Sequence, residues 1–132
     1  MKHIFTLGLV MVVFASCEII IVEPQYDKRD SITGYWEIDE YSETYNYSVL
    51  YDIYISKSAS TYDGIWIKNL YDINVTVHGY VQGDKIIIPF QVVDDYEISG
   101  IGTIWNDKIT FKYTVYDTYY GGLTDYLDAI AW

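Results

Sequence analysis

The sequence predicts an all-β domain, an eight-stranded antiparallel up-and-down barrel, with a two-sheet β-sandwich as the alternative. Apolar and polar residues alternate over successive short stretches, turn residues separate these stretches at near-even spacing, and no window keeps a helical period. Tyr and Ile are abundant, which favours strands over helices. Sequence-adjacent strands without a long crossover favour the barrel, because closing a sheet removes its exposed edges.

The first three expected strands span residues 33–41, 45–56 and 64–71. Each alternates apolar with polar side chains, so each presents one apolar face and one wet face. In the first strand, Trp36 and Ile38 share a face. A Ser-rich connection separates the second strand from the third.

Residues 73–92 form the clearest hairpin, with alternating strands on both sides of a turn at Gly83. We expect the return strand to place four apolar side chains on one face: Ile86, Ile88, Phe90 and Val92. Pro89 has no backbone N–H to donate to a ladder, which predicts a bulge, a bend or an unpaired edge at this position.

The last three expected strands span 96–105, 109–115 and 123–132, and a short helix is an alternative for the last of them. Gly100 and Gly102 fall on one face of the sixth strand. Two glycines on one face indicate a sharp bend or close packing, as at the corner of a barrel.

The chain has 132 residues, which corresponds to one domain, and a formal net charge of −11. Removing the first sixteen residues, which contain Lys2, leaves 19 acidic and 7 basic residues, a charge of about −12. Such a surface repels polyanions, so nucleic acid is not an expected partner. The acidic residues are spread along the chain, as in a solvated surface.

The N-terminus predicts a lipid anchor. A short basic start precedes an apolar run over 4–15, which has the length of a signal-peptide core and is too short to span a bilayer. Ala15 and Ser16 then precede Cys17, the chain's one cysteine, which has no disulfide partner in the sequence. This arrangement resembles the lipobox of bacterial lipoproteins, in which the cysteine is lipidated and becomes the mature N-terminus. An ordinary secretory signal or an uncleaved anchor is the alternative.

The predicted organisation is therefore a signal peptide over 1–16, a tether over 17–31 and a barrel domain over 32–132. Gly34-Tyr35-Trp36 resembles the Gly-x-Trp signature of lipocalins and related calycins. Further motifs resemble the small lipocalin-like lipoproteins of Gram-negative gut bacteria: 77–79, 86–91, 99–102, 108–113 and 124–125. The resemblance implies a location in the cell envelope, at the outer membrane, with either face of the membrane open. Classical lipocalins are longer and bind small apolar ligands.

The sequence does not predict an enzyme. After removal of the signal peptide the chain's histidine is His78, on the polar face of a strand, and the cysteine is the lipidated one, so no base accompanies a nucleophile. The densest acidic group is Asp94, Asp95 and Glu97, which starts in an expected turn and matches neither a calcium-loop pattern nor a catalytic pair. No zinc spacing or phosphate-binding loop is found, so no metal or other cofactor is expected.

Aromatic side chains are the remaining candidates for binding, because Tyr and Trp combine a flat stacking face with a hydrogen-bonding tip. Trp66 and Trp105 lie opposite the isoleucines of their strands and are the candidate ligand-binding residues. The leading hypothesis is an anchored envelope lipoprotein that binds a small apolar molecule in the barrel mouth or a glycan on an aromatic face. The alternative is a structural protein with a filled barrel that contacts another envelope component.

Overall fold

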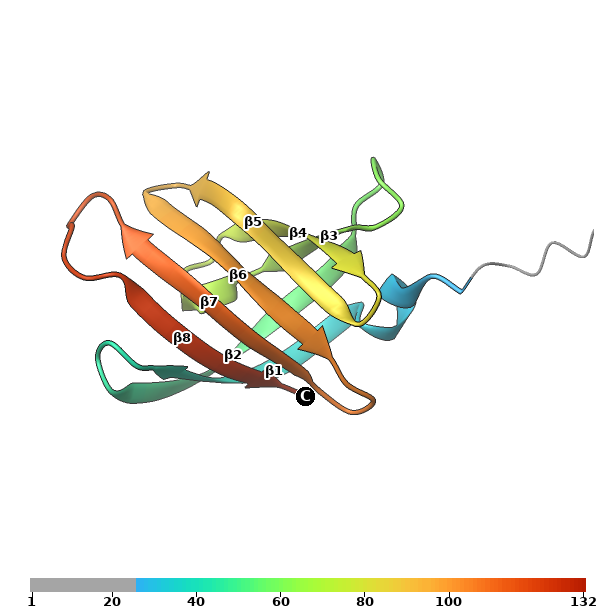
Figure 1. Ribbon diagram of the computed structural model, residues 1–132, viewed down its shortest axis with the longest axis horizontal. Coiled ribbons are helices and arrows are strands. Elements are labelled where there is room, and N and C mark those ends of the chain that lie inside the picture. The colour runs from blue at the N-terminus through green and yellow to red at the C-terminus, as the bar shows by residue number, and fades with distance from the viewer. Residues whose placement is uncertain (1–25) are drawn as a thin grey trace, which may run out of the picture.

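A computed structural model describes residues 26–132, which form a closed antiparallel barrel of eight strands in up-and-down order (Figure 1). Each strand pairs with the next along the chain, and β1 pairs with β8 to close the sheet. The predicted barrel is confirmed, and the sandwich alternative is wrong. The predicted signal peptide, Cys17 and the tether as far as residue 25 lie outside the described residues.

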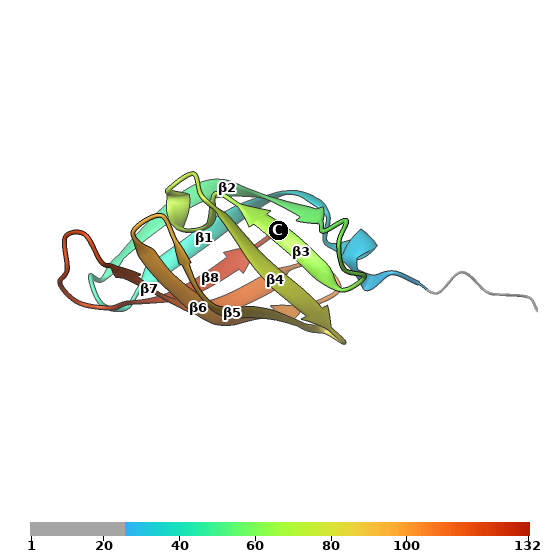
Figure 2. The same ribbon diagram turned by 90° about the horizontal axis from the view of Figure 1, so that it is seen from above.

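The strands are short and joined mostly by tight turns. They are β1 (Gly34–Ser42), β2 (Tyr47–Lys57), β3 (Gly64–Lys68), β4 (Thr76–Gln82), β5 (Lys85–Val93), β6 (Tyr96–Ile104), β7 (Ile109–Asp117) and β8 (Asp125–Ala131). Two short 3₁₀ helices, η1 (Lys28–Ser31) and η2 (Leu70–Asp72), precede β1 and join β3 to β4. Figure 2 shows them at opposite ends of the barrel. We call these the η1 end and the η2 end.

Inward-facing side chains fill the barrel, as the alternation of the strands predicts. The largest fully buried ones are Phe111, Ile32, Ile38, Ile53, Ile55, Ile65, Ile67, Leu70, Ile86, Ile88, Ile98 and Ile109. Trp36 packs against this core, and its indole N–H donates to the carbonyl of Ile32 over 2.8 Å.

The glycines of β6 allow β7 to approach closely, as predicted. A Cβ atom built on Gly100 would lie 2.6 Å from Cα of Tyr113, and one on Gly102 would lie 2.9 Å from the ring of Phe111. Both separations are far below van der Waals contact. The aromatic side chains of β7 therefore occupy the volume that side chains at these two positions would need.

Pro89 interrupts the pairing of β5, and the interruption reverses the faces of the residues that follow. The β5–β6 register shifts between Ile88 and Gln91, and the paired part of β4–β5 ends at Ile87. The prediction that Phe90 and Val92 face inward is therefore wrong for these two side chains, which are exposed. A bulge adds one residue to a strand, so the alternation changes phase there.

The side chain of Gln91 replaces the backbone hydrogen bonds that are missing between β4 and β5 beyond Ile87. Its amide oxygen accepts from the backbone N–H of His78 over 3.0 Å, and its amide nitrogen donates to the carbonyls of His78 (2.9 Å) and Pro89 (3.0 Å). A side-chain amide thus bonds to β4 as a peptide group of a neighbouring strand would.

The η1 end is closed by residues that the sequence had assigned to the tether. Arg29 is buried there and donates from one guanidinium nitrogen to the carbonyls of Ser58, Thr61 and Gly64, at 2.9–3.2 Å. Asp27 forms an ion pair with the opposite edge of the same guanidinium, at 3.0 Å. This fork of hydrogen bonds fixes the β2–β3 loop against η1.

The η2 end is covered by the connection from β3 to β4, which the sequence had predicted as strand. Four non-glycine residues there have positive φ: Asn69, Tyr71, Asp72 and Asn74. Left-handed backbone cannot continue a β-ladder, so β3 ends at Lys68 and β4 begins at Thr76. The segment instead folds back over the interior of the barrel.

Candidate functional site

The outer face of β1–β4 carries an open groove of about 850 Å³ that includes Trp66. The indole is partly exposed and lies between Ser56 of β2 and His78 of β4, its register neighbours. Tyr35 and Tyr54 lie at the same groove with ring centroids 4.8 Å apart. Three aromatic side chains from three adjacent strands thus share one concave outer surface, which we call the β1–β4 groove.

Polar groups surround these rings. The lining includes Asp52, Ser56, Lys68, Asn69, Asn74 and Thr76. Asn69 is fixed, since its amide nitrogen donates to the carbonyl of Asp52 over 2.9 Å and its amide oxygen accepts from the N–H of Asn74. Within the described residues, no hydrogen bond or ion pair engages the carboxylate of Asp52 or the ammonium of Lys68. Both groups are available to a ligand.

Trp105, the other predicted candidate, lies elsewhere. It follows β6 in the turn to β7, where its indole N–H donates to Thr110 over 3.1 Å and the ammonium of Lys108 lies 5.9 Å from its ring centroid. Trp105 does not line the β1–β4 groove. The structure therefore does not bring the two predicted tryptophans together.

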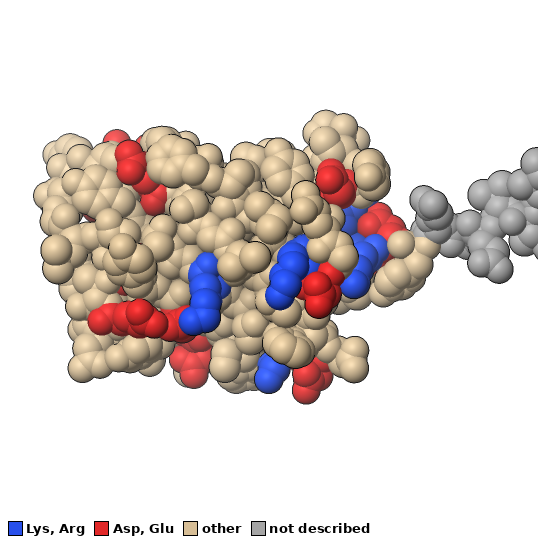
Figure 3. Space-filling model, in the orientation of Figure 1, with Lys and Arg blue, Asp and Glu red and all other residues tan. Residues whose placement is uncertain are grey.

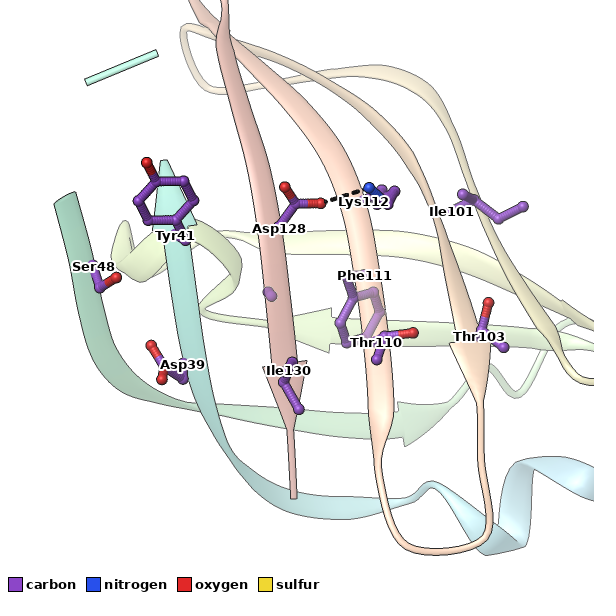
Figure 4. Close-up of a pocket in the computed structure, with 11 residues that line it drawn as sticks. Asp39, Tyr41, Ser48, Ile101, Thr103, Thr110, Phe111, Lys112, Asp128 and Ile130 are labelled. Carbon is purple, nitrogen blue, oxygen red and sulfur yellow. Dashed lines mark ion pairs between the residues drawn. The ribbon is translucent and has the colours of Figure 1, made fainter. Parts of the chain in front are cut away.

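A second groove, of about 560 Å³, crosses the outer faces of β1, β2, β6, β7 and β8 (Figure 4). Its exposed apolar side chains are Ile101 and Ile130, and Lys112 pairs with Asp128 at 2.9 Å across it. Its charged pair is already satisfied, and its one aromatic side chain with an outward face is Tyr41. It offers fewer stacking surfaces than the β1–β4 groove.

Inside the barrel, the η2 end holds a polar cluster. Glu40 is buried, and one of its carboxylate oxygens accepts hydrogen bonds from the hydroxyls of Tyr51, at 2.5 Å, and of Tyr113. Burial raises the pKa of Glu40, and the two hydroxyls offset part of that rise. Burial and the neighbouring carboxylate also raise the pKa of both tyrosines, so they stay protonated donors.

The cluster extends to the chain segment that covers it. The backbone N–H of Tyr71 donates to the hydroxyl of Tyr51 over 2.9 Å, and the hydroxyl of Tyr71 donates to Asp125 over 2.6 Å. Ser42 donates to the other oxygen of Asp125 over 2.5 Å. Every buried side-chain polar atom of the described residues has a hydrogen-bond partner, so this cluster is a satisfied network.

Sequence reasoning missed this network, although the signal was present. Glu40 and Ser42 lie on the same face of β1 as Trp36 and Ile38, and Asp125 lies on the same face of β8 as the buried residues of that strand. Alternation alone places these three side chains inward. Their hydrogen-bond partners come from strands far away in the sequence, so alternation could not identify the partners.

The remaining predicted positions lie on the surface. His78 faces outward, partly buried between Trp66 and Tyr80, with its ring nitrogen Nδ1 3.2 Å from the amide oxygen of Gln91. Asp94 and Asp95 form the exposed β5–β6 turn, as predicted. Residues 26–132 contain no group of three or more His, Cys, Asp or Glu side chains that could hold a metal ion. Within the same residues, no helix has the length and apolar character needed to cross a membrane.

The fold is that of a closed, up-and-down antiparallel β-barrel with eight strands. No protein-family model and no curated protein matches the chain. Among solved structures, a redesigned β-barrel is similar, with a TM-score of 0.56 and 9% sequence identity over 81% of this chain and 95% of that one. At this identity the likeness concerns the fold alone.

Proposed function

We propose that this protein is a lipid-anchored, lipocalin-like lipoprotein of the Gram-negative cell envelope, and that it binds a glycan in the β1–β4 groove without catalysing a reaction. The observation that carries the proposal is the groove itself, where Tyr35, Tyr54 and Trp66 lie among polar side chains that are open to a ligand. Sugars present apolar C–H faces and hydroxyl rims, which such a surface can stack and hydrogen-bond.

The filled interior favours this site over an apolar ligand in the barrel mouth. An eight-stranded barrel is just wide enough to be filled by side chains or to hold one small ligand. Here isoleucines and Phe111 fill the middle, Arg29 and Ile32 close the η1 end, and the network around Glu40 occupies the η2 end. A small apolar molecule would have to displace these satisfied groups.

Charge narrows the class of glycan. The chain carries a net charge of −11, and Lys68 is the one cationic side chain that lines the groove, which also contains the carboxylate of Asp52. A strongly acidic polysaccharide would be repelled over most of the surface. The proposed ligand is therefore a neutral oligosaccharide, with Asp52, Asn69 and Asn74 accepting or donating hydrogen bonds to its hydroxyls.

Two matched tryptophan variants test the site. Trp66→Ala removes an aromatic ring from the groove, whereas Trp105→Ala removes an exposed ring that lies outside it. Binding of the mature protein to an immobilised panel of neutral and acidic oligosaccharides should weaken about fivefold in Trp66→Ala, because a stacking ring contributes about 1 kcal/mol. The Trp105→Ala variant should bind like the parent.

A second pair of variants separates stacking from polar recognition. Asp52→Asn should weaken binding to neutral oligosaccharides several-fold, since a carboxylate is a stronger hydrogen-bond acceptor than an amide. Asp39→Asn changes the charge equally in the other outer groove and should have no effect. Equal binding by the parent, Trp66→Ala and Asp52→Asn proteins would rule out the β1–β4 groove as the glycan site.

A further inference from the structure

The η2 end of the barrel carries exposed tyrosine side chains that the proposed glycan site does not use. Tyr119 and Tyr120, in the β7–β8 loop, are 73% and 84% exposed, and their rings meet edge to face with centroids 4.8 Å apart. Tyr45 and Tyr47, in and after the β1–β2 turn, are half-exposed at the same end. Exposed aromatic groups gathered at one end of a fold mark an interaction surface more often than chance exposure does.

Hydrogen bonds hold the β7–β8 loop in place. The N–H of Thr118 donates to the carbonyl of Asp95 over 2.7 Å, which ties the β7–β8 loop to the β5–β6 turn. The carboxylate of Asp117 accepts from the N–H groups of Tyr119 (2.9 Å) and Tyr120 (3.1 Å). The two tyrosines are therefore presented on an ordered loop, which reduces the entropy lost when a partner binds.

Charge is distributed unequally between the two ends. The cationic side chains of the η1 end are Lys28, Arg29, Lys57, Lys85 and Lys108. The connections at the η2 end, residues 43–46, 69–75, 94–95 and 118–124, contain no Lys or Arg. On the face that Figure 3 shows, Lys and Arg lie over the middle and the η1 end, and acidic or uncharged residues lie at the opposite extreme.

We propose that this acidic aromatic tip, formed by Asp94, Asp95, Tyr119 and Tyr120, docks a lysine- or arginine-rich segment of a partner protein. The two carboxylates attract the cations, and the faces of the tyrosines stabilise them by cation–π contact. Charge decides against other occupants. A second copy meeting tip to tip would bring an equally acidic surface, and at its η1 end Arg29 and Lys57 are already paired with Asp27 and Asp30. Nucleic acid or an anionic lipid surface would be repelled.

The chain path leaves the tip accessible. The described residues begin at Tyr26 beside η1, so whatever precedes them joins the barrel at the end opposite the tip (Figure 1). An anchor attached through the N-terminal segment would connect to the η1 end. This geometry suits a protein that contacts a partner with its far end.

Fluorescent octalysine and octaarginine peptides, titrated into the mature full-length protein, test the proposal, with octaglutamate as the negative control. The double variant Tyr119→Ala, Tyr120→Ala should weaken peptide binding about tenfold, from the loss of two cation–π partners. The double variant Asp94→Asn, Asp95→Asn should weaken it by a similar factor. Asn tolerates positive φ, so the turn at Asp94 is retained.

The matched control is Asp84→Asn, Asp107→Asn, which removes the same two charges from turns at the η1 end. It should change peptide affinity less than about twofold. If the control weakens binding as much as the Asp94, Asp95 variant does, the attraction comes from net charge alone and the docking surface is refuted. Unchanged binding by the tyrosine variant overturns the proposal as well.

Two further measurements test the electrostatic attraction and distinguish the tip from the glycan groove. Raising the salt concentration from about 10 mM to about 150 mM should weaken binding of the parent strongly, because the Debye length falls from about 30 Å to about 8 Å. Trp66→Ala should leave peptide binding unchanged, so failure at the tip and failure at the glycan groove are distinguishable. Loss of neutral-oligosaccharide binding in the tyrosine variant, with peptide binding intact, would assign the tip to a glycan and contradict the proposal.

Discussion

The hydroxyl of Tyr51 donates a 2.5 Å hydrogen bond to the carboxylate of Glu40 inside the barrel. Tyr113 donates to the same oxygen, and Tyr71 binds the hydroxyl of Tyr51 through its backbone N–H. The segment that covers the η2 end is thus attached to a buried acidic group by two successive hydrogen bonds. The ionisation of that group couples the stability of the barrel to pH.

Glu40 should make the protein less stable as the pH rises. Burial raises its pKa above the ordinary value of 4.5, so the folded protein keeps a proton that the unfolded chain loses. The stabilisation from this group is fully present below the unfolded pKa and is lost as the pH rises through the folded pKa. Each unit by which the two pKa values differ corresponds to about 1.4 kcal/mol.

Glu40→Gln keeps the shape and the acceptor oxygen while removing the titration. We expect the free energy of unfolding, measured by urea denaturation between pH 4 and pH 8, to depend less on pH in this variant and to exceed that of the parent at neutral pH. Glu37→Gln removes a carboxylate from the exposed face of the same strand and serves as the control. A Glu40→Gln protein with the parent's pH dependence would contradict the assigned role of Glu40.

Gln91→Glu should destabilise the barrel by about 1–3 kcal/mol, because it removes two hydrogen bonds that contribute about 0.5–1.5 kcal/mol each. The substitution keeps the size of the side chain but removes the N–H donors that bind the carbonyls of His78 and Pro89. Gln82→Glu makes the same change at an exposed position of β4 and should shift the unfolding midpoint little. Equal midpoints for the two variants would show that Gln91 does not replace the ladder.

Gly100→Ala should cost about 3 kcal/mol or prevent folding, because overpacking of a barrel interior forces the backbone to move. The added methyl group would lie 2.5 Å from the carbonyl oxygen of Lys112 and within the side chain of Tyr113. Ser99→Ala, at the adjacent half-exposed position, is the control. Thermal unfolding of the two variants measures the difference, and a Gly100→Ala melting temperature equal to that of Ser99→Ala would contradict the close approach.

Cys17→Ser should release the protein from the membrane fraction, because a lipid-anchored protein loses its acyl chains with the cysteine. Detergent phase partitioning and the intact mass of the purified protein provide the measurement. Ser16→Ala keeps a small residue before Cys17 and should leave the anchor intact. A parent protein without added lipid mass would remove the basis for the lipoprotein proposal.

Local alternation, the spacing of the turns and the absence of a long crossover were together sufficient to predict the barrel. Successive side chains of a strand point to opposite faces, so the apolar face can be identified from neighbouring residues alone. Trp36, Ile38, Ile86 and Ile88 could therefore be assigned to the interior from the sequence. The turn at Asp94 followed from residue type, since Asp accepts positive φ more readily than most residues. The bulge at Pro89 followed from its missing N–H.

Alternation failed where the backbone leaves the regular ladder. Beyond the bulge, Phe90 and Val92 reversed faces, and between β3 and β4 the left-handed residues converted predicted strand into η2. The first event depends on the register between β5 and β6, and the second on the backbone conformation of four residues between β3 and β4. The alternation of apolar and polar residues specifies neither.

The sequence by itself determined the fold class, the acidic character and the outward position of Trp66, because composition and two-residue periodicity govern them. Only the tertiary structure decided that Tyr35 and Tyr54 join Trp66 in one groove while Trp105 does not. It also decided that Glu40, Tyr51 and Tyr113 meet inside the barrel. These groups lie on different strands, and closure of the sheet is the step that brings them within hydrogen-bonding or stacking distance.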